Sequence, residues 1–406
     1  MAPTLERPCF ALTKRVLGSV GIVCLLLLGG SFPARAESTV EIPKKLNLAL
    51  RNVGINLTGD WTFSRKGVYP GNRDDEIDTV IRDGFHHVVF IVSVDEFFNL
   101  NCGEMVESCL NQNIVKLRIN LIAYQIRELS QKYADVGFVI SAKSDAYVGG
   151  INAPVHYQTV IYKALEERKE IQAAYINLWT RIAELTADIP TDTLAFNLMN
   201  EPEWHTFAGG LPAARDVWLD LAETMIDKIR EITPNRIVIV EGIDKAIAFW
   251  PQGKTPDTIL KPLNRSGVFY AFHFYDPFDW THQKTMAAHP LEPWMKKMVS
   301  IELKAFVAYA KNYNIPVLLT EIGVWGPYFE NGAQKSGATA QARAEWARIL
   351  ADALLPNGIG LTWWGLHQNN TPYVSFIQGE NTRAIQPKLV RDDLLWKALR
   401  LHPRAD

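Results

Sequence analysis

Short runs of apolar and β-branched residues recur along the chain, each bounded by turn residues. Eight such runs cover residues 53–57, 88–92, 138–140, 194–199, 237–240, 268–274, 317–320 and 359–364. Their residues are mostly apolar throughout instead of alternating with polar ones, which is typical of strands buried on both faces of a parallel sheet. We therefore predict eight buried strands.

The segments between these runs have helical spacing. One of them has a single apolar stripe on one helix face, formed by Trp218, Leu221, Met225, Ile229 and Ile232. Pro234-Asn235 should end this helix. Strands that alternate with helices over this length predict an α/β fold, a single-domain (β/α)8 TIM barrel. A doubly wound open sheet is the alternative, but no Gly-rich phosphate-binding turn follows the first run.

The first residues have the features of a secretory signal peptide. Basic residues within 7–15 precede an apolar run over 16–28, and Ala34-Arg35-Ala36 has the small residues that a signal peptidase accepts. We expect cleavage after Ala36, so that residues 1–36 are the signal and residues 37–406 the barrel domain. This predicts a secreted or periplasmic protein without stable membrane association, since the apolar run is too short to span a bilayer.

Composition and charge limit the kinds of molecule that this protein is expected to bind. The 406 residues are 48% hydrophobic and 21% charged, as in an ordinary globular protein. Lys plus Arg number 42 against 44 Asp plus Glu, with no basic tract, which argues against nucleic acid and anionic membrane surfaces as partners. A polysaccharide or oligosaccharide fits this charge balance better. We expect a monomer that needs no cofactor.

The cysteines agree with export. Cys9 and Cys24 lie in the predicted signal, which leaves Cys102 and Cys109 as a pair. In an oxidising compartment such a pair predicts a disulfide, which in a loop this short stabilises the fold by about 2 kcal/mol. The alternative is two reduced, unconnected side chains. Neither cysteine has neighbours at metal-ligand spacing, so we expect no metal site.

Two glutamates follow predicted strands. Glu201 comes after the fourth strand in Asn200-Glu201-Pro202, and Glu321 ends the seventh in Thr320-Glu321-Ile322-Gly323. Because the carboxyl ends of barrel strands meet at one face, these two can face each other across the mouth, as glycoside hydrolysis requires of an acid and a carboxylate. A single strand-end Glu is more often a salt-bridge partner or a helix cap. Glu241 ends the fifth strand but is left out, because it would not face Glu201 across the cleft.

An ordered set of motifs resembles glycoside hydrolase family 5, the cellulase family of retaining barrel enzymes. The set comprises Gly54-Ile55-Asn56-Leu57, Asn200-Glu201-Pro202, His273-Phe274-Tyr275, Glu321 and a Trp at the end of the last run, and it spans nearly the whole predicted domain. The resemblance implies that Glu201 is the general acid/base and Glu321 the nucleophile. A retaining mechanism also needs a raised pKa at Glu201, which the negative charge of Glu321 and partial desolvation favour.

The resemblance extends to substrate-binding residues. It implies that Asn200 donates to the sugar 2-hydroxyl, that His273 contacts substrate and that Tyr275 orients Glu321. Among the tryptophans, Trp364 matches the residue that floors the cleaved sugar's subsite better than Trp363. Other tryptophans that follow strand ends are candidates for extending the aromatic surface on which sugars stack. They are Trp204, Trp325, Trp250 and Trp280. The alternatives are a capping role for Asn200 and ordinary packing for the aromatic rings.

Two positions depart from the family pattern. Val89 stands where the second strand carries an Arg, and Ile140-Ser141-Ala142-Lys143-Ser144 lacks the third strand's His. We hypothesise that Lys143 replaces the missing cation. The leading prediction is a secreted retaining glycoside hydrolase that cleaves β-glycosidic bonds within a β-glucan or related polysaccharide. A catalytically weak carbohydrate-binding barrel and a transglycosylase with the same residues remain alternatives.

Overall fold

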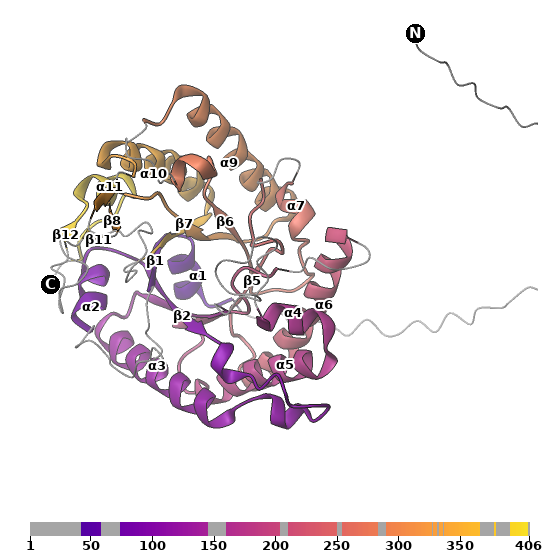
Figure 1. Ribbon diagram of the computed structural model, residues 1–406. Helices are drawn as coiled ribbons and strands as arrows, with labels where there is room; N and C mark the ends of the chain where they lie inside the picture. The colour runs from indigo at the N-terminus through magenta and orange to yellow at the C-terminus, as the bar shows by residue number, and fades with distance from the viewer. Residues whose placement is uncertain are drawn as a thin grey trace, which may run out of the picture. The chain divides into compact units, whose positions relative to one another are not determined.

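Eight parallel strands close into a barrel in the computed structural model of the protein, and helices surround them (Figure 1). The structure describes residues 42–57, 74–144, 160–203, 210–249, 254–282, 290–326, 328–330, 333–335, 337–365, 377–378 and 390–404. The predicted signal peptide with its cleavage site, and the candidates Trp204 and Trp250, lie outside these ranges.

The barrel strands lie close to the eight apolar runs. They are β1 (Val53–Leu57), β2 (His87–Ser93), β3 (Gly137–Lys143), β4 (Leu194–Asn197), β5 (Val238–Glu241), β6 (Val268–Phe274), β7 (Val317–Ile322) and β10 (Gly360–Trp364). Their order around the ring is β1-β10-β7-β6-β5-β4-β3-β2, and every neighbouring pair is parallel. The predicted (β/α)8 barrel is confirmed, and the open doubly wound sheet is excluded.

Strand β4 is shorter than predicted, because the chain leaves the strand after Asn197 while remaining buried. Side chains from a helix take over from the sheet there. The carbonyl oxygen of Leu198 accepts hydrogen bonds from the Tyr175 hydroxyl at 2.8 Å and from the Trp179 indole nitrogen at 3.0 Å. An apolar run alone does not distinguish this buried, side-chain-anchored backbone from a strand.

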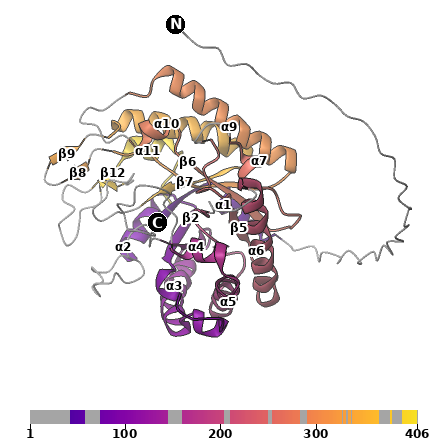
Figure 2. The same cartoon turned by 45° about the vertical axis from the view of Figure 1, so that its right-hand side comes forward.

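Helices cover the outside of the barrel (Figures 1 and 2). They are α2 (Asp74–Arg82), α3 (Gln112–Lys132), α4 (Val160–Glu167), α5 (Lys169–Leu185), α6 (Gly210–Ile232), α7 (Pro256–Ile259), α8 (Phe278–Thr281), α9 (Pro293–Tyr313), α10 (Ala340–Leu354) and α11 (Asp393–Ala398). Helix α6 contains the predicted stripe and ends before Pro234, as expected. Within the described ranges, no helix has both the length and the apolar character needed to cross a membrane.

Short elements complete the described chain. They are 3₁₀ turns at Asp95–Phe97, Val106–Cys109 and Leu355–Asn357, and two antiparallel pairs, β8 (Tyr328–Glu330) with β9 (Ala333–Lys335) and β11 (Ile377–Gln378) with β12 (Val390–Arg391). The eight apolar runs do not predict these pairs, because two or three residues of strand are too short for a periodic signal.

Helix α1 (Lys44–Leu50) packs under the barrel, where Leu46 and Leu50 join the apolar residues of its interior. The buried His87 connects this helix to the strands. Its ring nitrogens lie 3.0 Å from the Ala49 carbonyl oxygen and 2.8 Å from the Thr362 hydroxyl. Residue 54 must be glycine, because a Cβ there would lie 2.1 Å from the imidazole of His87. The amino end of the barrel is thus a packed, structural layer.

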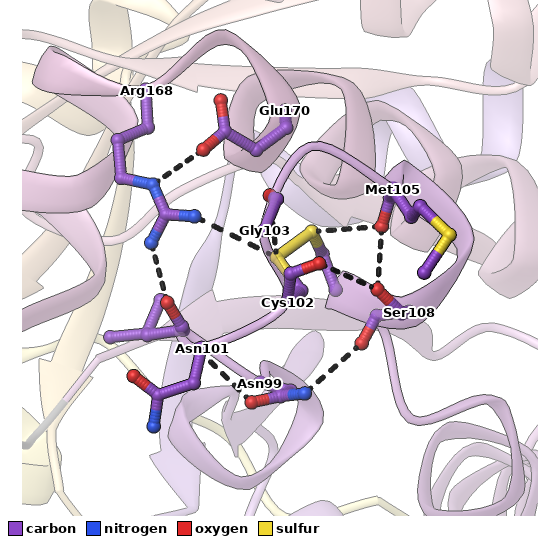
Figure 3. Close-up of a disulfide and its surroundings, with 10 residues drawn as sticks. Asn99, Asn101, Cys102, Gly103, Met105, Ser108, Arg168 and Glu170 are labelled. Atoms are coloured by element: carbon purple, nitrogen blue, oxygen red, sulfur yellow. Dashed lines mark hydrogen bonds and ion pairs between the residues drawn. A yellow bond between two sulfur atoms is a disulfide. The ribbon is translucent and has the colours of Figure 1, made fainter.

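The predicted Cys102–Cys109 disulfide is present (Figure 3). It closes a short loop between β2 and α3, and Arg168 ties this loop to α5 by donating to the Leu100 carbonyl at 2.6 Å. The preceding Phe98 stacks on Tyr175, with ring centroids 5.8 Å apart. Because Tyr175 also holds the backbone that follows β4, the disulfide loop supports the strand end that carries Glu201.

Candidate active site

Glu201 and Glu321 meet at the carboxyl end of the barrel. Glu201 follows β4 and Glu321 lies in β7, three strands away around the ring. An oxygen of each carboxyl and a ring nitrogen of His273 all lie within 4.8 Å of one another. Glu321 is buried, whereas the Glu201 side chain is 24% exposed. The two carboxyls therefore share one small space, open to solvent on the side of Glu201.

The backbone that carries Glu201 is held by hydrogen bonds at the Asn200 amide, the Asn200 carbonyl and the Glu201 amide. The Asn200 amide donates to the Ala142 carbonyl at 2.7 Å, and the Tyr162 hydroxyl donates to the Asn200 carbonyl. The Glu201 amide donates to the Glu241 carboxylate at 2.9 Å. Glu201 itself has a φ of 54°, a left-handed conformation that a residue with a Cβ keeps only when its surroundings hold it. These bonds set the direction of the Glu201 side chain.

Glu321 receives a hydrogen bond on each of its carboxylate oxygens. The Asn200 amide nitrogen lies 3.1 Å from Oε1, and the Tyr275 hydroxyl lies 2.7 Å from Oε2. Both donors are buried, so water does not compete with them for the Glu321 carboxylate. Two donors aimed at one carboxylate orient it and favour its ionised form. Asn200, expected to bind sugar, thus contacts Glu321 directly, and its Oδ1 is buried with no hydrogen-bond partner among the described residues.

His273 lies between the acids instead of on an open surface. Its Nδ1 is 3.3 Å from Glu201 Oε1 and 3.4 Å from Glu321 Oε2, while its Nε2 is 3.1 Å from Glu241 Oε2. Burial alone would lower the pKa of His273, but these three carboxylates raise it well above its usual value. The carboxylates on both sides of the ring therefore favour its protonated, positively charged form.

The two carboxyls of the pair differ strongly in acidity. Burial raises the pKa of Glu321 to about 7, with the negative charge of Glu201 adding to it and the charges of His273 and Lys143 opposing it. Burial also raises the pKa of Glu201, but the hydrogen bond and charge of His273 outweigh it and lower the value to about 2. The pair thus retains one proton up to about pH 7. The raised pKa expected at Glu201 is found at Glu321 instead.

Two lysines add positive charge beside the pair. Lys143, at the end of β3, lowers the pKa of both Glu201 and Glu321 by its charge, so it is near both carboxyls. Lys245 lowers the pKa of Glu201 as well and forms an ion pair with the buried Glu203 at 2.8 Å. This arrangement agrees with the hypothesis that Lys143 supplies the cation missing from the second strand, and His273 supplies another.

The candidate tryptophans differ in their surroundings. The Trp364 ring lies beneath the Lys143 ammonium, 4.5 Å from its centroid, and so faces the acid pair's side of the barrel mouth. Trp363, the rejected neighbour, is fully buried and packs against Trp346. Trp325 is 2% exposed and lies beside His282, and Trp280 donates its indole hydrogen to the Pro290 carbonyl. The Trp325 and Trp280 rings are thus nearly enclosed by protein, and a contact of either ring with sugar stays a prediction.

Val89 has no polar role. It lies inside the barrel in one apolar layer with Leu46 and Leu50 of α1 and with residues of five other strands, including Val139 and Phe269. The family's Arg position is thus filled by packing in this chain. The positive charges that act on the two acids are instead those of Lys143 and His273.

Sequence reasoning missed Glu241 and Asn197, which form a buried layer under the pair. Asn197 Nδ2 donates to Glu241 Oε1 at 2.6 Å and to the Ser141 hydroxyl at 3.0 Å. Glu241 was set aside because only partners across the cleft were considered. The usable signal was its place at the end of β5, between the strands that carry Glu201 and His273.

Glu201, His273 and Glu321 also carry the atom types that bind metal ions. In this chain, however, both oxygens of Glu321 already accept hydrogen bonds and the far nitrogen of His273 faces Glu241. Hydrogen-bond donors of the protein thus already stabilise the Glu321 carboxylate, and Glu241 already faces the His273 ring. We interpret it as an acid pair with a positioned histidine.

A closed parallel barrel with two carboxyls close together at its carboxyl end is the architecture of a barrel glycosidase. The family model described as Cellulase (glycosyl hydrolase family 5) matches residues 64–370 of the chain. The chain belongs to glycoside hydrolase family 5.

Curated relatives carry names consistent with this family. Cellodextrinase A of Ruminococcus flavefaciens is 26% identical over 236 residues, which cover 57% of this chain and 60% of the relative. Endoglucanase H of Acetivibrio thermocellus is 27% identical over 187 residues, which cover 46% of this chain and 18% of the relative. The matched part is thus less than two thirds of the length of either relative.

Solved structures show the same fold. A broad specificity endoglucanase from Clostridium acetobutylicum superposes with a TM-score of 0.64 at 16% identity, covering 88% of this chain and 99% of that one. The cellulose synthase subunit Z from Clostridioides difficile superposes with a TM-score of 0.61 at 15% identity, covering 86% and 99%. At such identities the likeness concerns the barrel alone.

Proposed function

We propose that this protein is a retaining β-glycosidase that cleaves internal bonds of a β-glucan or related polysaccharide, with Glu321 as nucleophile and Glu201 as acid/base. The observation that supports this most is the closeness of the two carboxyls, since one oxygen of Glu201 and one of Glu321 lie within 4.8 Å of each other. In retaining enzymes the two groups are about 5 to 5.5 Å apart, whereas inverting enzymes leave room for a water between them. The relatives' names as endoglucanases and a cellodextrinase favour the glucan class.

In the first step a Glu321 oxygen attacks the anomeric carbon, the glycosidic C–O bond breaks, and the proton of Glu201 passes to the leaving oxygen. In the second step Glu201 takes a proton from water, the water oxygen attacks the anomeric carbon, and the ester bond to Glu321 breaks. Asn200 and Tyr275, which donate to Glu321, hold it for the attack. Trp364 offers a flat apolar face to the sugar ring.

The first step needs the shared proton on Glu201, although the higher pKa belongs to Glu321. His273 provides a path between them, because its Nδ1 lies 3.3 Å from one carboxyl and 3.4 Å from the other. The imidazolium gives its Nδ1 proton to Glu201 and takes the proton of Glu321, so its own charge does not change. A sugar bound beside Glu201 removes water from that carboxyl, which favours its protonated form.

Activity on polysaccharides tests the proposal. The purified protein is incubated with β-glucans, mannans and xylans, the products are sized, and the anomer formed first is read by NMR. We expect oligosaccharides of mixed length from a β-glucan and a β-anomer as first product. An activated 2-fluoro β-glycoside should label Glu321 covalently, as mass spectrometry of the digested protein would show. Release of the α-anomer, or a label on another residue, contradicts the mechanism.

A carbohydrate-binding barrel with little turnover is the second candidate. It is favoured by Val89, which leaves the family's Arg position apolar. Such a protein would bind oligosaccharides, release no sugar and leave Glu321 unlabelled. The labelling experiment therefore separates the two candidates. The signal-like first 36 residues support export in either case, and sequencing the amino terminus of protein recovered outside the cytoplasm tests cleavage after Ala36.

Removing the charge of Lys143 should move the pH profile to higher pH. Lys143 lowers the pKa of Glu201 and of Glu321, so Lys143→Met raises both values. We expect both limbs of the kcat/KM profile to move to higher pH by roughly half to one pH unit, and kcat to be about tenfold lower. The exposed Lys116 on α3 is the control, and Lys116→Met should leave the limbs in place. Unmoved limbs in Lys143→Met would show that Lys143 is not the substitute cation.

A further inference from the structure

A continuous layer of buried polar side chains crosses four neighbouring strands below the acid pair. Ser141 of β3, Asn197 of β4, Glu241 of β5 and His273 of β6 form it in that order. Their contacts measure 3.0 Å from Ser141 to Asn197, 2.6 Å from Asn197 to Glu241 and 3.1 Å from Glu241 to His273. An apolar layer that includes Val89, Val139 and Ile239 lies next to it on the side of the amino end of the barrel.

Glu241 is the negative charge of that layer, and it is only 1% exposed. An ionised carboxylate removed from water costs several kcal/mol unless charged and hydrogen-bonding partners replace the water. Glu241 has such partners on both oxygens. Oε1 accepts from Asn197, and Oε2 accepts from the Glu201 amide at 2.9 Å and faces the His273 imidazolium. The charge of Glu241 is thus stabilised in the interior by three specific partners, Asn197, the Glu201 amide and His273.

Those partners connect Glu241 to both members of the acid pair. Through the Glu201 amide it holds the left-handed backbone that aims the acid/base. Through His273 it fixes the ring whose other nitrogen faces Glu201 and Glu321. Glu241 cannot reach a sugar itself, because it is enclosed beneath these groups.

We propose that Glu241 is a positioning residue of the hydrolysis: it anchors the Glu201 main chain and holds His273 as a cation between the two acids. This rests on the proposed function for its kinetic consequences. The charged groups around His273 are Glu241 on β5, Glu201 after β4 and Glu321 on β7, with Lys143 at the end of β3 acting on the same acids. Tyr275, two residues after His273 in the chain, donates to Glu321.

The test is Glu241→Gln, which keeps the size of the side chain and removes its charge. Loss of a nearby negative charge lowers the pKa of His273 and of the acid pair, so each loses its proton at lower pH. We expect kcat on an aryl β-glycoside to fall 10- to 100-fold with KM changed less than threefold. The alkaline limb of kcat/KM should move to lower pH by half a unit or more, opposite to Lys143→Met.

The control is Glu302→Gln on α9. Burial raises the pKa of Glu302 to about 8, so it is protonated at neutral pH and the amide resembles its native form. The alkaline limb of the kcat/KM profile of Glu302→Gln should lie at the same pH as in the unaltered enzyme. If the limb of Glu241→Gln also stays in place, the loss of activity follows folding alone and the proposal is overturned.

A titration that needs no turnover accompanies the kinetics. The ¹⁵N signals of His273, assigned by their loss in His273→Gln, report its charge in the unaltered protein and in Glu241→Gln. We expect an imidazolium at pH 7 in the unaltered protein and a pKa lower by at least one unit in the variant. A neutral ring in the unaltered protein overturns the proposal, even if Glu241→Gln does not fold. If the unaltered protein cleaves no glycoside, the proposed function fails while this titration still decides the role of Glu241.

Discussion

Replacing Glu321 by Ala should lower the hydrolysis of an aryl β-glycoside by about 10⁴-fold or more, because no covalent intermediate can then form. Glu321 is the acid with fixed donors on both oxygens, from Asn200 and Tyr275, as a nucleophile requires. The deletion leaves a small space at the anomeric carbon, on the side opposite the leaving group. Added azide should enter that space and restore turnover.

The configuration of the product makes this prediction specific. Azide that replaces Glu321 attacks from the nucleophile's side, so the product is an α-glycosyl azide, visible by NMR. Glu241→Ala is the matched control, since Glu241 is a buried strand-end Glu at the same mouth but is enclosed beneath the pair. It should give no azide product. A β-glycosyl azide from Glu321→Ala, or an α-product from the control, would remove Glu321 from the nucleophile's role.

Replacing Glu201 by Ala should have an effect that depends on the leaving group. A general acid contributes about 10² to 10⁴ in rate when the leaving oxygen is a poor one, as in a glucan. Dinitrophenolate and fluoride need no proton, so the first step with those substrates should be nearly normal. The covalent intermediate should then accumulate, because Glu201 no longer activates water. A burst of dinitrophenolate followed by slow turnover is the expected time course.

Azide should again identify the role of the residue. It needs no general base and attacks the intermediate on the side of Glu201, so the product is a β-glycosyl azide. Glu203 is the informative comparison, because burial raises its pKa to about 7 and it lies near Glu201. Glu203→Ala should show neither the burst nor the azide product. If it shows both and Glu201→Ala does not, Glu203 is the acid.

The fold could be predicted because the apolar runs are local and continuous. Each strand of a barrel is buried on both faces, so β6 and β10 are legible from the sequence with at most one residue of error. The end of β4 is the exception. There Tyr175 and Trp179 of α5 satisfy the Leu198 carbonyl, and such contacts between distant segments leave no periodic pattern.

The sequence predicts which residues form the site better than it predicts which atoms they contact. Glu201 and Glu321 follow from the convergence of strand ends on one face of a barrel, and Tyr275 follows from the resemblance to glycoside hydrolase family 5. The place of His273 was expected at the substrate, yet its ring lies between carboxylates. The sequence shows that His273 follows a strand but does not show the depth at which its side chain lies.

By itself, the sequence determined the eight strands, the disulfide partners and the order in which two acids follow strands four and seven. These depend on hydrophobic period and on which residues are near each other in the chain. Tertiary structure alone decided which acid keeps the proton, why Lys143 is beside both acids, and that Glu241 supports them. The physical reason is that a pKa depends on burial and on the distances between charges, and these distances join strands that are far apart in sequence.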